Sequence, residues 1–255
     1  MTHPALHTAV CDLFGVKYPI VQTGMGWVAG ARLTSATSAA GGLGILASAT
    51  MTFDQLTDAV HEVRDRTDGP FGVNLRADQD DIDERIELLI RERVRVASFA
   101  QAPGERLVKQ LRDAGVVTMP TVGAPRHAEK VAGWGVDALI AQGAEGGGHT
   151  GTIPTSLLLP AVVDAVDIPV LAAGGFTDGR GLVAALAWGA AGVAMGANAP
   201  MLTKATMVDG RLETGILPTG QGVGVIDELP TVADLVTRII DEAEQALTRL
   251  EKGGA

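Results

Sequence analysis

The chain has 255 residues, of which 46% are hydrophobic and 20% charged, proportions typical of a soluble globular protein with a sizeable core. Its formal net charge of −10 argues against a nucleic-acid partner, because neutralising phosphates requires a basic surface. The sequence also lacks a polybasic run, an apolar stretch of membrane-spanning length, a signal-peptide pattern and a CxxC pair. We therefore expect a cytoplasmic protein without a membrane partner, in which the single Cys11 is a small buried hydrophobe.

Short apolar runs of strand length alternate along the chain with amphipathic stretches of helical length. The runs are continuous rather than alternating, which is typical of parallel strands buried on both faces. The predicted strands are Pro19–Thr23, Leu43–Ala47, Phe71–Asn74, Val94–Phe99, Val116–Thr121, Ala138–Gln142, Ile168–Ala172 and Ala191–Met195. The predicted helices are Asp54–Arg66, Asp80–Arg93, Gly104–Ala114, Pro125–Trp134, Ser156–Val166, Gly179–Trp188 and, after a glycine-rich loop, Thr231–Glu251.

Eight strands joined by helices fit either a closed barrel or an open doubly wound sheet. A dinucleotide-binding open sheet has a glycine fingerprint after its first strand and an acidic residue at the end of the second. Here Gly24 and Gly26 follow the first strand, but no acidic residue ends the second. The other glycine-rich turns follow strands six, seven and eight, close to where a barrel builds its phosphate site. We therefore predict an α/β fold, a (β/α)8 TIM barrel that forms one domain over residues 1–255.

The sharpest candidate for chemistry is the segment QGAEGGGHTG, which runs from Gln142 to Gly151 directly after predicted strand six. Barrel active sites lie at this end of the strands. Three consecutive glycines cost conformational entropy, which indicates unusual dihedral angles or a flat ligand against the backbone. A histidine can titrate near neutrality, so His149 could act as a general acid or base. The alternative is a solvated histidine on a flexible loop, but the position after a strand favours a functional role.

A second candidate is the segment AAGGFTDGRG after strand seven, in which Gly174 and Gly175 lead into a predicted helix. Backbone amides before a helix N-terminus can hold a phosphate. Gly196, at the end of strand eight, could supply a further amide from the other side. Taken alone, the first pair of glycines would equally fit a plain tight turn.

Amide side chains and open backbone gather at the same rim of the predicted barrel. They come from Gln22, Gly24, Met25, Asn74 and Gln142. Amides suit the polar edge of a flavin, and a methionine offers a polarisable contact to a ring, although each residue alone would fit strand-end capping. The sequence has no HExxH, Cys/His cluster, GxSxG or Walker motif, so we expect no metal site. The chemistry must then come from an organic cofactor or from His149 alone.

Six segments in order resemble the nitronate monooxygenase (2-nitropropane dioxygenase-like) family of FMN barrels, which also includes flavin-dependent enoyl reductases of fatty-acid synthesis. They are PIVQTGMGW, SAAGGLGILAS, FGVN, QGAEGGGHTG, AAGGFTDGRG and GVAMG. Each motif is weak alone, but six in order are specific. The resemblance runs from Leu13 to Gly196 and resumes at GQGVGVIDELP.

The resemblance implies a role for each site residue. His149 matches the family's catalytic histidine, which removes a proton next to an activating group while flavin N5 accepts hydride or electrons. The residues expected to bind FMN are Gln22, Gly24, Met25 and Asn74 along the isoalloxazine, Gln142 and Gly147 at its polar edge, and Gly174, Gly175 and Gly196 at the phosphate.

The segments VQTGMGWVAG and QGAEGGGHTG are most similar to those of an actinobacterial branch of the family. This branch acts on sterol-ring degradation intermediates held as coenzyme A thioesters. The implied reaction is α,β-dehydrogenation or reduction of an acyl-CoA, with His149 as acid/base. Oxidation of alkyl nitronates by O2, a flavin-free phosphate-binding isomerase or lyase, and a non-catalytic binding barrel are the alternatives. NAD(P) as electron partner and a homodimer are compatible with the family, although no motif specifies either. Family members carry a longer helical insert after strand eight, and here we expect it to be shortened or missing, because Gly196 runs straight into Ala197-Asn198-Ala199-Pro200.

Overall fold

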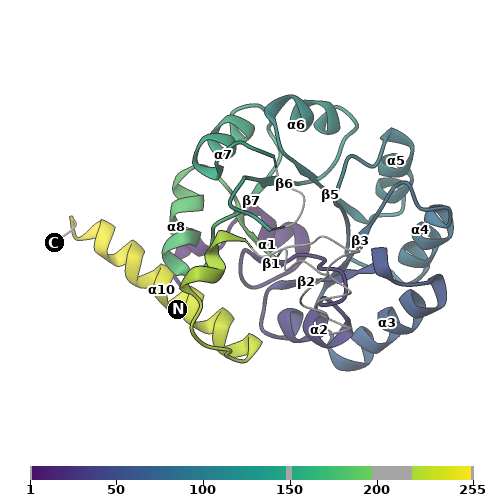
Figure 1. Ribbon diagram of the computed structural model, residues 1–255, viewed down its shortest axis with the longest axis horizontal. Coiled ribbons are helices and arrows are strands. Elements are labelled where there is room, and N and C mark those ends of the chain that lie inside the picture. The colour runs from purple at the N-terminus through teal and green to yellow at the C-terminus, as the bar shows by residue number, and fades with distance from the viewer. Residues whose placement is uncertain (1, 148–150, 197–219, 254–255) are drawn as a thin grey trace, which may run out of the picture.

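The computed structural model describes residues 2–147, 151–196 and 220–253. Eight parallel strands pair in chain order, and β1 pairs with β8, which closes the sheet into a barrel (Figure 1). The strands are β1 (Ile20–Gln22), β2 (Leu43–Ala47), β3 (Phe71–Leu75), β4 (Val96–Phe99), β5 (Val117–Val122), β6 (Leu139–Gln142), β7 (Val170–Ala173) and β8 (Gly192–Met195). The predicted TIM barrel and all eight predicted strands are confirmed, and the open sheet is excluded.

Helices form an outer ring around the strands (Figure 1). They are α2 (Ala31–Ala39), α3 (Phe53–Arg66), α4 (Ile82–Arg91), α5 (Glu105–Asp113), α6 (Pro125–Ala132), α7 (Thr155–Val163) and α8 (Gly179–Ala187), with a short 3-10 turn, η2 (Ser48–Thr50), after β2. Helix α3 begins with a capping box, a pair of reciprocal hydrogen bonds that favours the start of a helix. Thr52 accepts a hydrogen bond from the backbone N–H of Gln55, whose side chain accepts one from the backbone N–H of Thr52.

Helix α1 (Ala9–Phe14) closes the N-terminal end of the barrel. The 3-10 turn η1 (Pro4–Leu6) precedes it, and the backbone N–H of His3, just before this turn, donates to Glu244. Val10 and Phe14 of α1 are fully buried in the same apolar cluster as the inward-facing strand residues Ile45 and Met119. Cys11 is buried, as predicted. With one end closed by apolar side chains, a ligand reaches the barrel from the other end.

Helix α2 was not predicted, because its sequence ARLTSATSA has no apolar stripe. Its buried face consists of small residues, among them Thr34, Ser35 and Ser38. Small residues let α2 lie very close to β2, and a Cβ added at Gly44 would lie 2.1 Å from the carbonyl oxygen of Thr34. Close packing rather than bulk hydrophobicity holds this helix on the barrel.

The chain ends in the 3-10 turn η3 (Gln221–Val225) and the long helix α10 (Val232–Glu251). The middle of α10 packs on α8, and its C-terminal end extends away from the barrel (Figure 1). Ile239 and Ala243 of α10 are buried, and Gly179 of α8 lies so close that a Cβ there would be 2.2 Å from the carbonyl oxygen of Ile239. Among the helices that the structure describes, none is long and apolar enough to cross a membrane.

Candidate active site

A cavity of about 620 Å³ opens at the C-terminal ends of the strands. This volume lies within the usual range for sites that hold a cofactor or a drug-sized ligand. All eight strand ends, or the loops that follow them, contribute to its lining. Five of the predicted site residues line it, namely Gly24, Asn74, Gln142, Gly147 and Gly196.

Gly24 and Asn74 meet at one side of the cavity. The Asn74 side-chain amide donates to Ser98 Oγ (2.9 Å), and Ser48 Oγ donates to the Asn74 carbonyl oxygen (2.6 Å). A Cβ added at Gly24 would lie 2.4 Å from the Asn74 Cβ, a distance that real Cβ atoms do not reach. A fixed amide beside bare backbone is suited to a flat, hydrogen-bonding ligand.

Gln22 and Met25 lie near this wall but are not among its lining residues. The Gln22 side-chain nitrogen donates to the Ile45 carbonyl oxygen (3.1 Å), and its side-chain oxygen is buried without a partner among the described residues. A buried unpaired oxygen is costly and suits a donor supplied by a ligand. Met25 lies behind Gly196, where an added Cβ would come within 3.0 Å of the Met25 sulfur.

The loop after β6 is held from two sides. The Gln142 side-chain nitrogen donates to the Gly147 carbonyl oxygen (3.1 Å), and the Glu145 carboxylate accepts from the backbone N–H (2.9 Å) and hydroxyl (2.7 Å) of Thr155. Burial disfavours the charged carboxylate, but the hydrogen bonds from Thr155 outweigh it and lower the pKa of Glu145. The glycine loop is therefore anchored up to Gly147, and His149 lies just beyond, outside the described residues.

Glycines at the ends of β7 and β8 adopt backbone angles that favour glycine. The φ angles are 103° at Gly174, 83° at Gly175 and 141° at Gly196. A Cβ at Gly196 would lie 2.3 Å from Thr23 Oγ, so the backbone stays bare at the cavity wall. These positions remain predicted phosphate ligands.

Two backbone N–H groups at the N-terminus of α8 already donate to side-chain carboxylates. The N–H of Gly179 donates to the Glu242 carboxylate (2.9 Å), and the N–H of Gly181 donates to Asp178 (3.0 Å). Two carboxylates already satisfy this helix end and would repel a phosphate there. Phosphate binding on this side would fall to the strand-end glycines.

Two charged residues of the cavity wall, Arg76 and Asp78, were not predicted from the sequence. They follow β3 in a stretch rich in aspartate, which is typical of a solvated loop. The only available signal was their position just past Asn74 at the catalytic end of a strand. Buried Arg85 of α4 was also missed, because an arginine on an amphipathic helix usually faces solvent.

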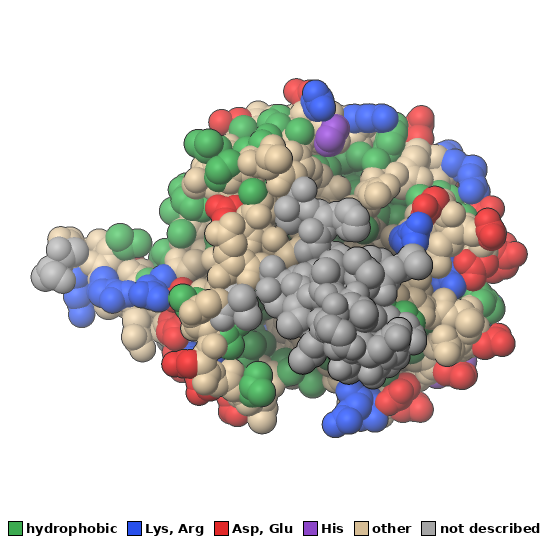
Figure 2. Space-filling view, viewed as in Figure 1, with side chains coloured by type: hydrophobic (Ala, Val, Ile, Leu, Met, Phe, Trp, Pro, Cys, Tyr) green, Lys and Arg blue, Asp and Glu red, His purple; other side chains and the backbone are tan. Residues whose placement is uncertain are grey.

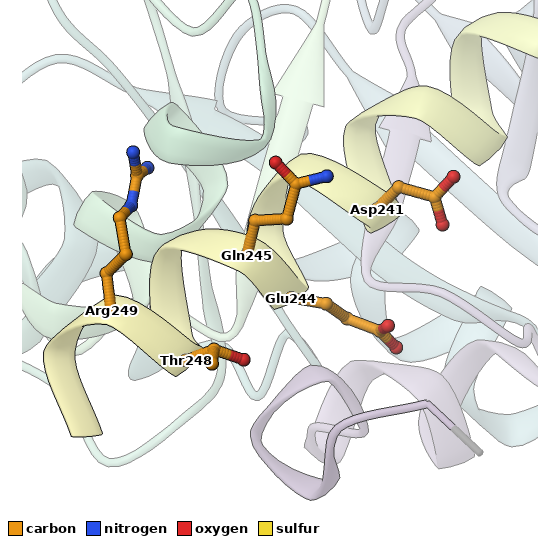
Figure 3. Close-up of a pocket in the computed structure, with 5 residues that line it drawn as sticks. All are labelled: Asp241, Glu244, Gln245, Thr248 and Arg249. Carbon is orange, nitrogen blue, oxygen red and sulfur yellow. The ribbon is translucent and has the colours of Figure 1, made fainter. Parts of the chain in front are cut away.

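A second hollow lies along α10 and is lined by Asp241, Glu244, Gln245, Thr248 and Arg249. Figure 3 shows all five side chains on successive turns of that one helix. They form its polar face, opposite the buried Ile239 and Ala243, and lie away from the strand ends. Figure 2 shows charged side chains gathered mainly at the outer margin of the barrel. The cavity at the strand ends is therefore the candidate active site.

Two named bacterial proteins are similar to this chain over nearly its whole length. The chain is 43% identical to the (3aS,4S,5R,7aS)-5-hydroxy-7a-methyl-1-oxo-octahydro-1H-indene-4-carboxyl-CoA dehydrogenase of Rhodococcus jostii (strain RHA1), over 96% of this chain and 98% of that protein. It is 42% identical to the protein of the same name from Mycobacterium tuberculosis (strain ATCC 25618 / H37Rv), over 98% of this chain and 99% of that protein.

The alignments with these relatives extend over 345 and 353 positions, although this chain has 255 residues. At least 90 aligned positions in each therefore have no residue in this chain. The segment after Gly196, where the sequence predicts a shortened or missing insert, lies outside the described residues as far as residue 219.

Two solved structures are also similar to this chain over nearly its whole length. FabK from Thermotoga maritima matches with a TM-score of 0.92 and 31% identity, over 96% of this chain and 99% of that one. The nitroalkane oxidase from Streptomyces ansochromogenes matches with a TM-score of 0.85 and 29% identity, over 95% of this chain and 100% of that one. The family model described as nitronate monooxygenase matches residues 7–87 and 81–204. The chain therefore belongs to the nitronate monooxygenase family of flavin-dependent oxidoreductases.

Proposed function

We propose that this protein is an FMN-dependent oxidoreductase that dehydrogenates, or in reverse reduces, a sterol-derived acyl-CoA between its α and β carbons. The observation that carries the proposal is the cavity at the strand ends, where Gly24, Asn74, Gln142, Gly147 and Gly196 of the family motifs converge. The names of the relatives at 43% and 42% identity support an acyl-CoA as the substrate.

The residues of the cavity fit FMN. Side chains would clash at Gly24 and Gly196, which leaves bare backbone for a ligand, and the side-chain oxygen of Gln22 is buried without a partner among the described residues. Asn74 would lie along the ring system with Gln22 and Met25, and Gln142 would hold its polar edge. Gly174, Gly175 and Gly196 would hold the phosphate through backbone N–H groups. When bound, FMN supplies a two-electron acceptor for hydride.

His149 would supply the proton transfer. The α-proton of a thioester is acidified by the adjacent carbonyl, and a positioned imidazole can remove it. The hydrogen bonds of Glu145 to Thr155 and of Gln142 to Gly147 fix the loop that leads to His149. In the reverse direction the same imidazole would return the proton to the α carbon.

The test is the variant His149→Ala, with the exposed His127→Ala on α6 as matched control. His149→Ala should keep FMN bound and lose turnover by roughly 10²–10⁴-fold, the usual contribution of a general acid or base. His127→Ala should retain both. Unchanged turnover in His149→Ala would remove this residue from the mechanism.

A second candidate function is oxidation of alkyl nitronates by O2, which the family match and the nitroalkane oxidase structure favour. Photoreduced enzyme under anaerobic conditions separates the two. Reoxidation of the flavin by an enoyl-CoA, without a reaction of the oxidised enzyme with a nitronate, supports the acyl-CoA function. Reaction of the oxidised enzyme with a nitronate, without reoxidation of the reduced flavin by an enoyl-CoA, supports the nitronate function. In a separate measurement, reduction of the flavin by NADH or NADPH would identify NAD(P) as the electron partner.

A further inference from the structure

One edge of the cavity carries charged side chains that are not among the residues proposed to bind FMN. Arg76 and Asp78, which follow β3, line the cavity beside Ala102 of the loop after β4. In the closed strand order, β3 and β4 lie across the barrel from β7 and β8. With the FMN phosphate at the ends of β7 and β8, this edge is at the opposite end of the cavity, where a substrate would lie.

Arg76 and Asp78 form a two-point ion pair. Arg76 Nε lies 3.0 Å from Asp78 Oδ1, and Arg76 Nη2 lies 2.7 Å from Asp78 Oδ2. The turn is fixed further because the backbone N–H of Gln79 donates to the Arg76 carbonyl oxygen (3.3 Å). A guanidinium carries five N–H groups, and this pairing uses only two of them. The pair thus offers donors from Arg76 and acceptor lone pairs from Asp78 side by side.

The charges around the pair do not favour an anionic ligand. Among the described residues that line the cavity, the charged ones are Arg76 and Asp78, and their charges cancel. Nearby, Arg85 pairs with Asp81 at 2.7 Å, and Asp80 adds an exposed negative charge. Hydrogen bonding from Arg76 lowers the pKa of Asp78, so the carboxylate stays ionised and accepts hydrogen bonds at neutral pH. This edge is suited to uncharged oxygen atoms rather than to the phosphates of coenzyme A.

We propose that Arg76 and Asp78 select an acyl group that carries ring hydroxyl and carbonyl oxygens, with Arg76 donating to either oxygen and Asp78 accepting from the hydroxyl. This inference rests on the proposed acyl-CoA function and defines its substrate class. The name of the Rhodococcus jostii relative describes such a group, a bicyclic acyl-CoA with one hydroxyl and one oxo substituent.

The experiment compares the affinities of two acyl-CoA ligands for the FMN-loaded chain, by isothermal titration calorimetry in a His149→Ala background that prevents turnover. One ligand has a bicyclic acyl group with a ring hydroxyl and a ring ketone, and the other has the same rings without these oxygens. The parent should bind the oxygenated ligand about tenfold to a hundredfold more tightly, as expected for hydrogen bonds with charged groups. Arg76→Met should abolish this preference, and Asp78→Ala should reduce it.

The matched control is Arg106→Met. Arg106 pairs with Asp83 at 2.8 Å on the exposed surface and does not line the cavity. This variant should keep the full preference. A parent without the preference, or a preference that survives Arg76→Met, would overturn the inference. Failure of the proposed function has a different signature, namely an unaltered chain without bound FMN or without turnover of any acyl-CoA.

Discussion

At the scale of single residues, substitution of Gly24 should have the clearest effect on cofactor binding. An added Cβ at this position would lie 2.4 Å from the Asn74 Cβ, so either Asn74 or the end of β1 must move. Gly24→Ala should therefore weaken FMN binding at least tenfold and lower the free energy of unfolding by about 1–3 kcal/mol, as overpacking usually does. FMN titration and urea unfolding measure the two effects.

Gly123→Ala is the control for this variant. Gly123 follows β5 at the same end of the barrel, and a Cβ there would meet nothing within 4 Å. FMN affinity should be unchanged in this variant. Equal FMN affinity in the two variants would show that the close contact of Gly24 with Asn74 has no part in the site.

The contribution of Glu145 to stability should depend on pH. Its pKa is lowered below the ordinary value of 4.5, because the hydrogen bonds from Thr155 outweigh the effect of burial. A depressed carboxyl pKa contributes stability that is fully present above 4.5 and is lost as pH falls through the lowered value. Glu145→Gln should therefore be less stable than the parent by about 1 kcal/mol at pH 7, with the difference shrinking below pH 4.5.

Urea unfolding across pH 3 to 7 (roughly the range over which carboxylates titrate) measures this difference. Glu129→Gln, on the exposed face of α6, should show no comparable loss at neutral pH. A Glu145→Gln variant with the same loss of stability at the acid and neutral ends would contradict the role given to the ionised carboxylate.

At the scale of secondary-structure elements, Arg85 joins α4 to the loop after β2. Its side chain is 2% exposed and donates to the carbonyl oxygens of Ser48 (3.0 Å) and Met51 (2.8 Å), while its Nε donates to Asp81. Ala49, between the two carbonyl groups, lines the active-site cavity. The arginine therefore holds part of the cavity wall from outside the barrel.

Arg85→Met should lower the free energy of unfolding by about 3 kcal/mol, because it leaves two carbonyl groups and a carboxylate without their buried partner. Arg106→Met removes an exposed ion pair and should cost less than about 1 kcal/mol. Urea unfolding compares the two. A loss no larger in Arg85→Met than in Arg106→Met would show that solvent replaces the arginine without cost.

The elements also show what sequence patterns can and cannot predict. The strands were predictable because both of their faces are buried, which gives continuous apolar runs such as Leu43–Ala47. Helix α2 was not, because it packs through Thr34, Ser35 and other small residues, and its fit depends on the missing side chain of Gly44. A close approach between two backbones leaves little signal in an apolar pattern.

At the scale of the whole molecule, the order of the glycine-rich turns predicted both the closed barrel and the position of the site. Gly24, Asn74, Gln142, Gly147 and Gly196 could be assigned to one cavity because the ends of parallel strands meet at one face. The presence of Arg76 and Asp78 in the cavity wall could not be predicted. It depends on which way the charged loop after β3 faces, and only the folded arrangement determines that direction.

The most direct test of the proposed function is the flavin content of the purified protein. We expect a flavin absorbance spectrum, with about one FMN per chain released on denaturation and taken up again on refolding. His149→Ala should retain the same FMN content. A well-folded chain that neither retains FMN nor binds it when it is added would contradict the account.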